Sequence, residues 1–163
     1  AVDELFASAG DDGAAAADDL PVVAYLRQHG ERALAKAYRI HVARHERYPH
    51  VRQLSYSQTA ASPTHEPLVR DCRGLIVDAR NGYAVVAQPF RKFFNYNEAH
   101  ADAIDWSTVT CTEKLDGSLA VLYHYDDGWH VSSSTRPDGS GVVARGGVTF
   151  AQLFWHIFDL VEQ

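Results

Sequence analysis

Two apolar segments, each interrupted by a dipeptide that favours a tight turn, most constrain the fold of this chain. Residues 72–90 (CRGLIVDARNGYAVVAQPF) place strand-like runs on both sides of Asn81-Gly82, and residues 118–136 (SLAVLYHYDDGWHVSSSTR) do so around Asp127-Gly128. Both dipeptides tolerate the positive φ that hairpin turns require. The sequence therefore predicts two antiparallel hairpins.

Helices are predicted at both ends of the folded region. Residues 20–29 and 31–36 have the length of two short helices, and Gly30 between them is typical of a helix end. The last segment repeats apolar residues at helical spacing, and Thr149 with Gln152 fits a capping box at its start. Together with the hairpins, these elements predict an α+β fold: an antiparallel β-sheet with flanking helices.

The remaining segments complete this organisation. Residues 38–57 alternate apolar and polar positions around Tyr48-Pro49 and predict two further strands. Residues 57–68 are predicted to be a loop. Residues 1–19 carry six acidic residues and no basic ones, and we expect a disordered acidic lead. The other 144 residues then hold 15 acids against 15 bases, so a polyanionic partner would need a local basic patch.

Composition excludes several classes of protein. No run of about 18 apolar residues is present, so no membrane span is expected. No basic segment followed by an apolar one opens the chain, so a secretory signal is not expected either. With only Cys72 and Cys111, we expect free thiols and a cytoplasmic protein. Neither the metal ligands nor the oligomeric state can be predicted from these patterns.

The segment from Cys111 to Tyr123 (CTEKLDGSLAVLY) carries the chemistry. It places Lys114, Asp116 and Gly117 within a strand-like run, so a buried strand is expected. A neutral lysine amine is a nucleophile, and burial or nearby cations lower its pKa to supply that form. The spacing matches the KxDG nucleotidyl-transfer motif. Four residues alone are also compatible with a surface lysine beside an Asp-Gly turn.

Sequence blocks on both sides of the motif extend the match. The upstream block RDCRGLIV, then AQPFRKFFNYNE, then EKLDGSL resemble in order and spacing the RNA ligases typified by phage T4 RNA ligase 1. The likeness spans about residues 38–160, and Gln88 stands where the family often has arginine. It implies an antiparallel nucleotidyltransferase (ATP-grasp-like ligase) domain that uses ATP and Mg²⁺.

The resemblance also implies the site residues. Lys114 is the residue that would carry AMP, and Glu113, Asp116 and Gly117 belong to its motif. The family's phosphate-contacting arginine corresponds to Arg73 in CRG, and a second cation corresponds to Lys92 in KFFN. Further nucleotide contacts are assigned to Tyr56 in LSYS and to Arg136 in STRPDGS. Arg73, Lys92 and Arg136 would neutralise a triphosphate and lower the pKa of Lys114.

Structural roles remain open for several of these residues. Arg73 could be a salt-bridge partner, Lys92 an edge-strand charge and Tyr56 an ordinary strand residue. Phe93 and Phe94 are expected to be core residues rather than base-stacking groups.

The family's later segments are not found in this sequence: a glutamate strand, an E-G strand and a K-x-K strand. The chain also has no methionine. We therefore interpret residues 20–163 as the N-terminal portion of an RNA ligase adenylyltransferase domain, incomplete at its C-terminus. The implied activity joins RNA 5′-phosphate and 3′-hydroxyl ends in RNA repair, through a lysyl-AMP intermediate. The alternative is a catalytically inactive nucleotide- or RNA-binding module derived from the ligase fold.

Overall fold

Six strands form two antiparallel sheets in the computed structural model, which describes residues 20–57, 62–143 and 145–161. The larger sheet has the order β1-β2-β3-β4, with β1 at Ile40–Arg44, β2 at Val51–Tyr56, β3 at Arg73–Asp78 and β4 at Ala84–Ala87. The smaller sheet pairs β5 (Val121–Tyr125) with β6 (Gly128–Ser132). The helices are α2 (Pro21–Tyr38), α3 (Pro67–Asp71) and α4 (Phe150–Val161), with a 3₁₀ turn, η2, at Ala79–Asn81. The predicted acidic lead, residues 1–19, lies outside the described residues.

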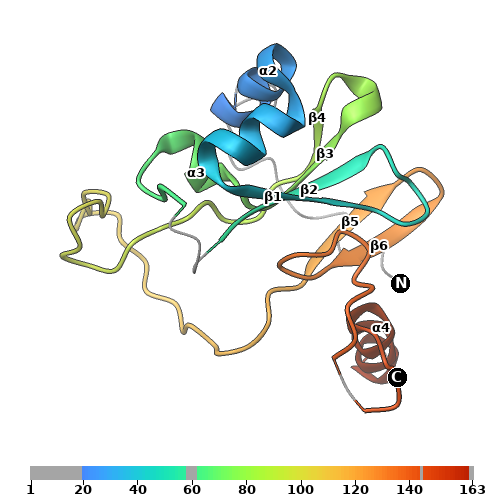
Figure 1. Cartoon of the computed structure of the whole chain (residues 1–163). Coiled ribbons are helices and arrows are strands. Elements are labelled where there is room, and N and C mark those ends of the chain that lie inside the picture. Colours follow the sequence, from blue (N-terminus) through green and yellow to red (C-terminus); the bar gives the residue numbers. More distant parts are fainter. Residues whose placement is uncertain (1–19, 58–61, 144, 162–163) are drawn as a thin grey trace.

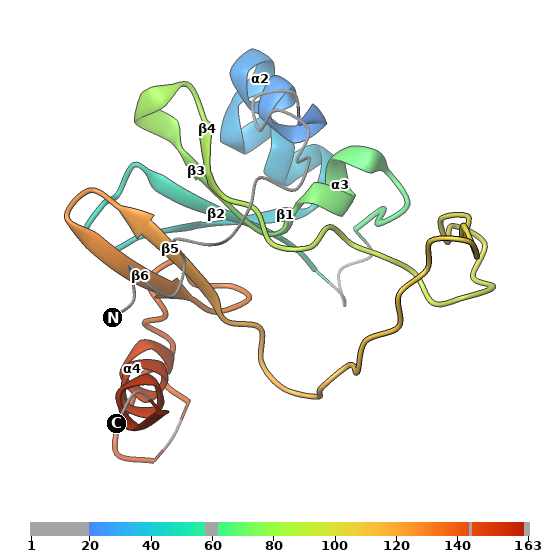
Figure 2. The same ribbon diagram turned by 180° about the vertical axis from the view of Figure 1, so that it is seen from behind.

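The elements stack in three layers around the larger sheet. Figure 1 shows α2 and α3 on one face of β1–β4 and the β5–β6 hairpin on the other, and the reverse view in Figure 2 agrees. The predicted α+β class with antiparallel strands is confirmed, although the strands form two sheets where one was expected.

The core under the helices follows from alternation along the strands. Leu54 of β2 and Leu75 of β3 are directly paired, and both side chains are completely buried against α2 and α3. From α2, Leu26 and Leu34 fill the same cluster. Truncating such a fully buried leucine to alanine typically costs about 2–5 kcal/mol of stability. This cluster therefore fixes α2 and α3 to the sheet.

The opposite face of the sheet is covered by the β5–β6 hairpin, partly through polar contacts. Ile76 packs with Tyr123 of β5 in a second buried cluster. Tyr125 donates to Asp78 (2.8 Å), and the amide of Gln53 donates to the carbonyl of Ser133 (2.8 Å). Burial acts to raise the pKa of Asp78, but hydrogen bonds from Tyr125 and two backbone amides hold it below its ordinary value. The hairpin is thus held in one position by directional bonds as well as by apolar contact.

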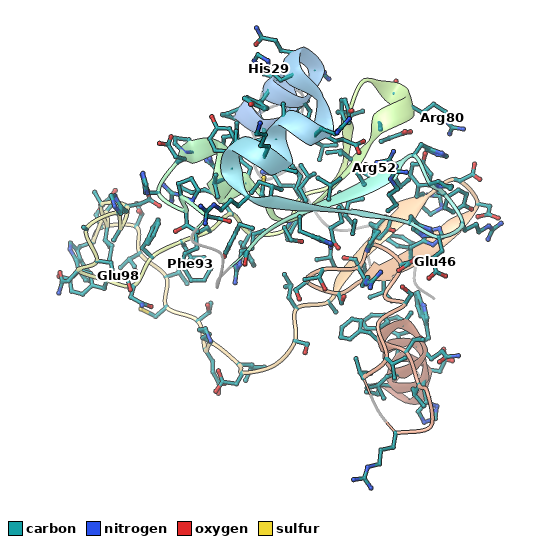
Figure 3. The ribbon with its side chains drawn as sticks, in the orientation of Figure 1. His29, Glu46, Arg52, Arg80, Phe93 and Glu98 are labelled. Atoms are coloured by element: carbon teal, nitrogen blue, oxygen red, sulfur yellow. The ribbon has the colours of Figure 1, made fainter. Side chains whose placement is uncertain are left out.

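The helix α2 contains the interruption that the sequence predicts. Pro21 occupies the first helical turn, where the missing amide proton is tolerated. Gly30 has φ 78° and ψ 171°, a conformation that divides α2 into two segments. Beyond it, Glu31 accepts from Arg52 at 2.7 Å, and Figure 3 shows Arg52 between the sheet and α2. This ion pair is largely shielded from solvent and orients the second segment on β2.

Both predicted hairpins form, with small differences at their turns. Between β3 and β4, Asp78 accepts from the amides of Arg80 and Asn81, and Gly82 is left-handed as expected. In the second hairpin, Tyr125 pairs with Gly128, so the turn consists of residues 126–127 and lies one position before the predicted dipeptide. Asp126 supplies the positive φ (53°), because aspartate tolerates that region better than most residues.

The capping box at the last helix is confirmed. Thr149 Oγ1 accepts from the amide of Gln152 (3.2 Å), and Gln152 Oε1 accepts from the amide of Thr149 (2.9 Å). This reciprocal pair satisfies two donors that the first turn of α4 leaves open. Within the described residues, no helix has the length and apolar character needed to cross a membrane.

A long connection without helix or strand joins the two sheets. Residues 88–120 leave β4, run outward beneath α3 and return to β5, as Figures 1 and 2 show. Large apolar side chains on it are exposed, including Phe90 (80%) and Trp106 (68%). This segment contains the KxDG motif, so its conformation decides where the motif lies.

A buried histidine stabilises the turn between β1 and β2. His45 Nδ1 accepts from the amides of Arg47 (3.1 Å) and Tyr48 (3.3 Å), so the neutral ring carries its proton on Nε2. Burial lowers the pKa of His45; Asp138 opposes that effect, while neighbouring His130, Arg47 and His50 add to it. The fold therefore requires the neutral imidazole.

Acidification is expected to destabilise the chain through His45. The folded-state pKa lies below the unfolded value of about 6.5, so the stabilisation is complete above that pH and is lost as the pH falls below it. Asn at position 45 keeps an acceptor for the two amides but cannot titrate. The stability difference between wild type and His45→Asn, measured by chemical denaturation, should shrink between about pH 7.5 and about pH 5.5. His124→Asn, at an exposed position, is the control, and an unchanged difference would contradict the assignment.

Candidate nucleotide site

A cavity of about 570 Å³ lies at the junction of the two sheets. Its volume is within the range of small-molecule sites, about 300–1,000 Å³. The walls come from the edges of β1 to β3 and from the chain on either side of the β5–β6 hairpin. The lining residues are His41, Ser55, Tyr56, Ser57, Cys72, Arg73, Gly74, Leu119, Ser134 and Thr135. Two of the residues assigned from the sequence, Tyr56 and Arg73, therefore share one cavity.

A β-bulge at Gly74 sets the direction of Arg73. Leu54 pairs with Leu75, but the next residue, Ser55, pairs with Arg73, so one extra residue sits on β3. Gly74 is that residue, with φ 93°, a conformation that side chains other than glycine's rarely adopt. Without the bulge, Arg73 would share the helix-covered face with Leu75. The bulge instead pairs Arg73 with Ser55, which faces the hairpin.

Arg73 has the electrostatic properties expected of an anion-binding residue. Its guanidinium lies over the ring of Phe93, 4.9 Å from the centroid. Within the described part of the chain, no carboxylate forms an ion pair with Arg73. Among those residues, the alternative that Arg73 is a salt-bridge partner is therefore wrong. Its charge is therefore available to a bound phosphate.

Hydrogen bonds between the sheets hold the opposite wall in place. Ser55 Oγ donates to the carbonyl of Ser134 at 2.9 Å. This bond lies beside the one from the Gln53 side chain to the carbonyl of Ser133. The amide of Tyr56 donates to the carbonyl of Cys72 at 2.8 Å and so fixes the strand that carries the tyrosine. Burial raises the pKa of the Cys72 thiol, which stays protonated and serves as packing. The cavity is thus built by side chains that are already constrained without a ligand.

Lys92 lies next to this cavity but does not line it. Its amide donates to the carbonyl of Arg70 (2.8 Å), and its Nζ donates to the carbonyl of Phe93 (2.8 Å) and lies 4.7 Å from the ring centroid of Phe94. The expectation that both phenylalanines are core residues is wrong: Phe93 is 50% exposed and Phe94 is half-buried. Their rings instead lie against the cations Arg73, Lys92 and Arg70. Figure 3 shows Phe93 where the chain leaves the sheet.

The KxDG motif is exposed and has no partner strand among the described residues, which corrects the expectation of a buried strand. The side chain of Lys114 is 78% exposed, and its Nζ lies 3.4 Å from Asp116 Oδ1. Glu113 and Gly117 are exposed as well. Residues 111–118 have no partner strand within the described residues, so no ladder of hydrogen bonds draws them into a sheet. The motif reaches the cavity only through Leu119, which follows it and lines the wall.

Arg136 lies just beyond the cavity wall. Its amide and carbonyl both bond to Ser133, in a turn that follows β6, and its side chain is exposed. Ser134 and Thr135, inside the same turn, line the cavity. The structure thus gathers Tyr56 and Arg73, leaves Lys92 and Arg136 at the periphery and keeps Lys114, Glu113, Asp116 and Gly117 outside.

Eight of the ten lining residues were not assigned from the sequence, and five of these carry a hydroxyl or imidazole group: His41, Ser55, Ser57, Ser134 and Thr135. The run of serines and threonine at the end of the second predicted hairpin segment is a usable signal, because hydroxyl groups at a strand end often bind ligands. His41 has no such signal, since an exposed edge-strand histidine is common.

A protein-held metal site is not found among residues 20–57, 62–143 and 145–161, where no group of three or more His, Cys, Asp or Glu side chains could hold an ion.

Comparison with known proteins agrees with the resemblance of the sequence blocks to RNA ligases. The model of the T4 RNA ligase 1 family, described as RNA ligase, matches residues 71–154. The chain therefore belongs to this RNA ligase family. The match includes Arg73, Lys92, Lys114 and Arg136.

Two relatives show the same likeness over longer segments. The chain is 33% identical over 119 residues to the "Putative bifunctional polynucleotide kinase/RNA ligase" of Autographa californica nuclear polyhedrosis virus, with 67% of this chain covered. It is 29% identical over 118 residues to an "RNA ligase" of Rhodothermus phage RM378, with 54% covered. The chain spans only 17% and 27% of these two proteins. No solved structure gives a significant match.

Replacing Gly74 should damage the cavity as well as the backbone. Gly74→Ala forces a side chain into φ 93°, and we expect a loss of about 1–2 kcal/mol in unfolding free energy. Because relief of this strain rotates Arg73 away from Ser55, ATP affinity should fall too, which isothermal titration calorimetry measures. Gly146→Ala is the matched control, with a similar φ (87°) outside the cavity lining. Equal affinities for the two variants would argue against the role of the bulge.

Proposed function

We propose that this chain is the nucleotide-binding part of an ATP-dependent RNA ligase that forms a covalent lysyl-AMP intermediate on Lys114. The observation that carries the proposal is the cavity, in which Tyr56 and Arg73 meet. Both were assigned to the nucleotide from separate sequence blocks. Membership of the RNA ligase family supports the reaction class.

The basic residues would stabilise the transferring phosphate. Arg73 lies in the cavity with an uncommitted charge, and Lys92 and Arg136 lie at its margins. One guanidinium group can bind two phosphate oxygens at once. Several cations together offset the negative charge that develops as pyrophosphate leaves. Tyr56 would line the side of the bound nucleotide that faces β2.

Lys114 would attack the α-phosphate as the neutral amine. A nitrogen–phosphorus bond forms, the bond to pyrophosphate breaks and the amine loses its proton to solvent. In the described conformation Lys114 points into solvent, five positions before Leu119 in the cavity wall. Five extended residues span at most about 17 Å, so an inward movement of this segment would bring the amine to the cavity.

The later steps follow from the same chemistry. AMP would pass from Lys114 to an RNA 5′-phosphate, and an RNA 3′-hydroxyl would then displace it and join the two ends. Mg²⁺ accompanies ATP in this type of reaction, usually bound through phosphates and one or two carboxylates. Because the described residues form no resident metal site, we assign no step to the ion.

A lysine substitution tests the covalent step. The protein expressed from the complete open reading frame, incubated with ATP and Mg²⁺, should gain the mass of one AMP. Lys114→Ala should abolish the adduct, because no other group replaces the amine. Lys36→Ala, at an exposed lysine of α2, should retain it. An adduct that survives Lys114→Ala in the intact-mass spectrum would refute the assignment.

The exposed position of Lys114 favours one second candidate, a nucleotide- or RNA-binding module without catalysis. Such a module would bind ATP in the same cavity and form no adduct. For the 163-residue chain by itself we expect weak adenylylation or none, because its motif segment has no partner strand among the described residues. Binding without an adduct in the protein from the complete reading frame would establish the module.

A further inference from the structure

A buried carboxylate, that of Asp71, lies next in sequence to Cys72 in the cavity wall. Asp71 ends α3, two residues before Arg73, and its side chain is 0% exposed. Burial raises the pKa of Asp71, and the charges of Arg91 and Arg70 oppose that rise. A carboxylate kept in such surroundings usually holds a specific partner.

That partner comes from the segment that carries Lys92. Arg91 Nε lies 2.5 Å from Asp71 Oδ1, although the Arg91 side chain remains 47% exposed. One residue later, the amide of Lys92 donates to the carbonyl of Arg70 (2.8 Å), and Arg70 Nε donates to the carbonyl of Lys92 (3.0 Å). Three contacts therefore hold residues 91–92 against the end of α3.

The same segment continues directly to the cavity arginine. Phe93 follows Lys92, and its ring lies beneath the guanidinium of Arg73. Asp71 thus lies two positions before Arg73, the first residue of β3, and contacts Arg91, which directly precedes Lys92 and Phe93. The two cations assigned to the phosphates come from sequence blocks about twenty residues apart, and the Asp71–Arg91 pair joins those blocks.

We infer that Asp71 is a positioning residue of the nucleotide site. It holds Arg91 and thereby fixes the positions of Lys92 and of the Phe93–Arg73 pair beside the cavity. This inference rests on the proposed function, because it concerns the binding of the nucleotide phosphates. Asp71 itself touches no substrate in this arrangement.

The two ends of the pair offer variants of different severity. Asp71→Asn leaves Arg91 free to be solvated, since its side chain is already half exposed. Arg91→Gln instead leaves a buried carboxylate without its partner, and Arg91→Lys keeps a charge there. Asp127→Asn is the matched control: Asp127 is 54% exposed and pairs with Arg47 at 2.6 Å, between the β5–β6 turn and the β1–β2 turn.

The test measures KM for ATP and kcat of adenylylation in the protein from the complete reading frame. We expect Asp71→Asn and Arg91→Gln each to raise KM about tenfold with a smaller change in kcat, and the double variant to be no worse than Arg91→Gln alone. Arg91→Lys should recover most of the affinity, and Asp127→Asn should stay within about twofold of wild type. In hydrogen exchange without ATP, the Lys92 amide should lose protection in Asp71→Asn.

The outcomes separate this inference from the proposed function. Wild-type KM or unchanged Lys92 protection in Asp71→Asn overturns the positioning role, and so does full additivity of the two substitutions. A loss of melting temperature with KM unchanged below the transition would show a merely structural residue and overturns it too. A wild-type protein that binds no ATP refutes the proposed function and, with it, the positioning role of Asp71.

Discussion

The burial of β3 on both faces is the constraint on which the rest of the structure depends. Leu75 and Val77 contact the helices, whereas Ile76 lies against the β5–β6 hairpin. A one-residue slip of β3 would exchange its two covered faces, so that Ile76 would turn towards the helices and Leu75 and Val77 towards the hairpin, and both cores would have to repack. The bulge at Gly74 is therefore held firmly, and with it the direction of Arg73. The cavity forms where this doubly covered strand begins.

Most of the secondary structure could be predicted because it is local. The turn preferences of Asn81-Gly82, the reciprocal pair of Thr149 with Gln152 and the interruption at Gly30 all depend on neighbouring residues. The second turn is displaced by one position because Asp126 supplies the left-handed conformation. That choice depends on strand register, which the dipeptide alone does not specify.

The site could be predicted less fully, because it depends on contacts between distant segments. Arg73 was found from its motif, but the bulge that aims it is visible only in the pairing of β2 with β3. His41 reaches the cavity through its place on β1, which no local pattern indicates. The motif around Lys114 has the composition of a buried strand, yet burial requires a partner strand, and residues 111–118 have none in the described part of the chain. Composition gives this segment a preference for the strand conformation, but only pairing with another strand would place it in a sheet.

The two cysteines differ in a way that makes the chain convenient to probe. Cys72 is completely buried, and burial raises the pKa of its thiol, whereas Cys111 is exposed three residues before Lys114. Thiol reagents attack the thiolate and need access to it, so they should modify Cys111 and spare Cys72 in the folded protein. A fluorophore or spin label could thus be attached beside the KxDG motif without any mutation. Its signal would report directly whether this segment moves inward when a nucleotide is added.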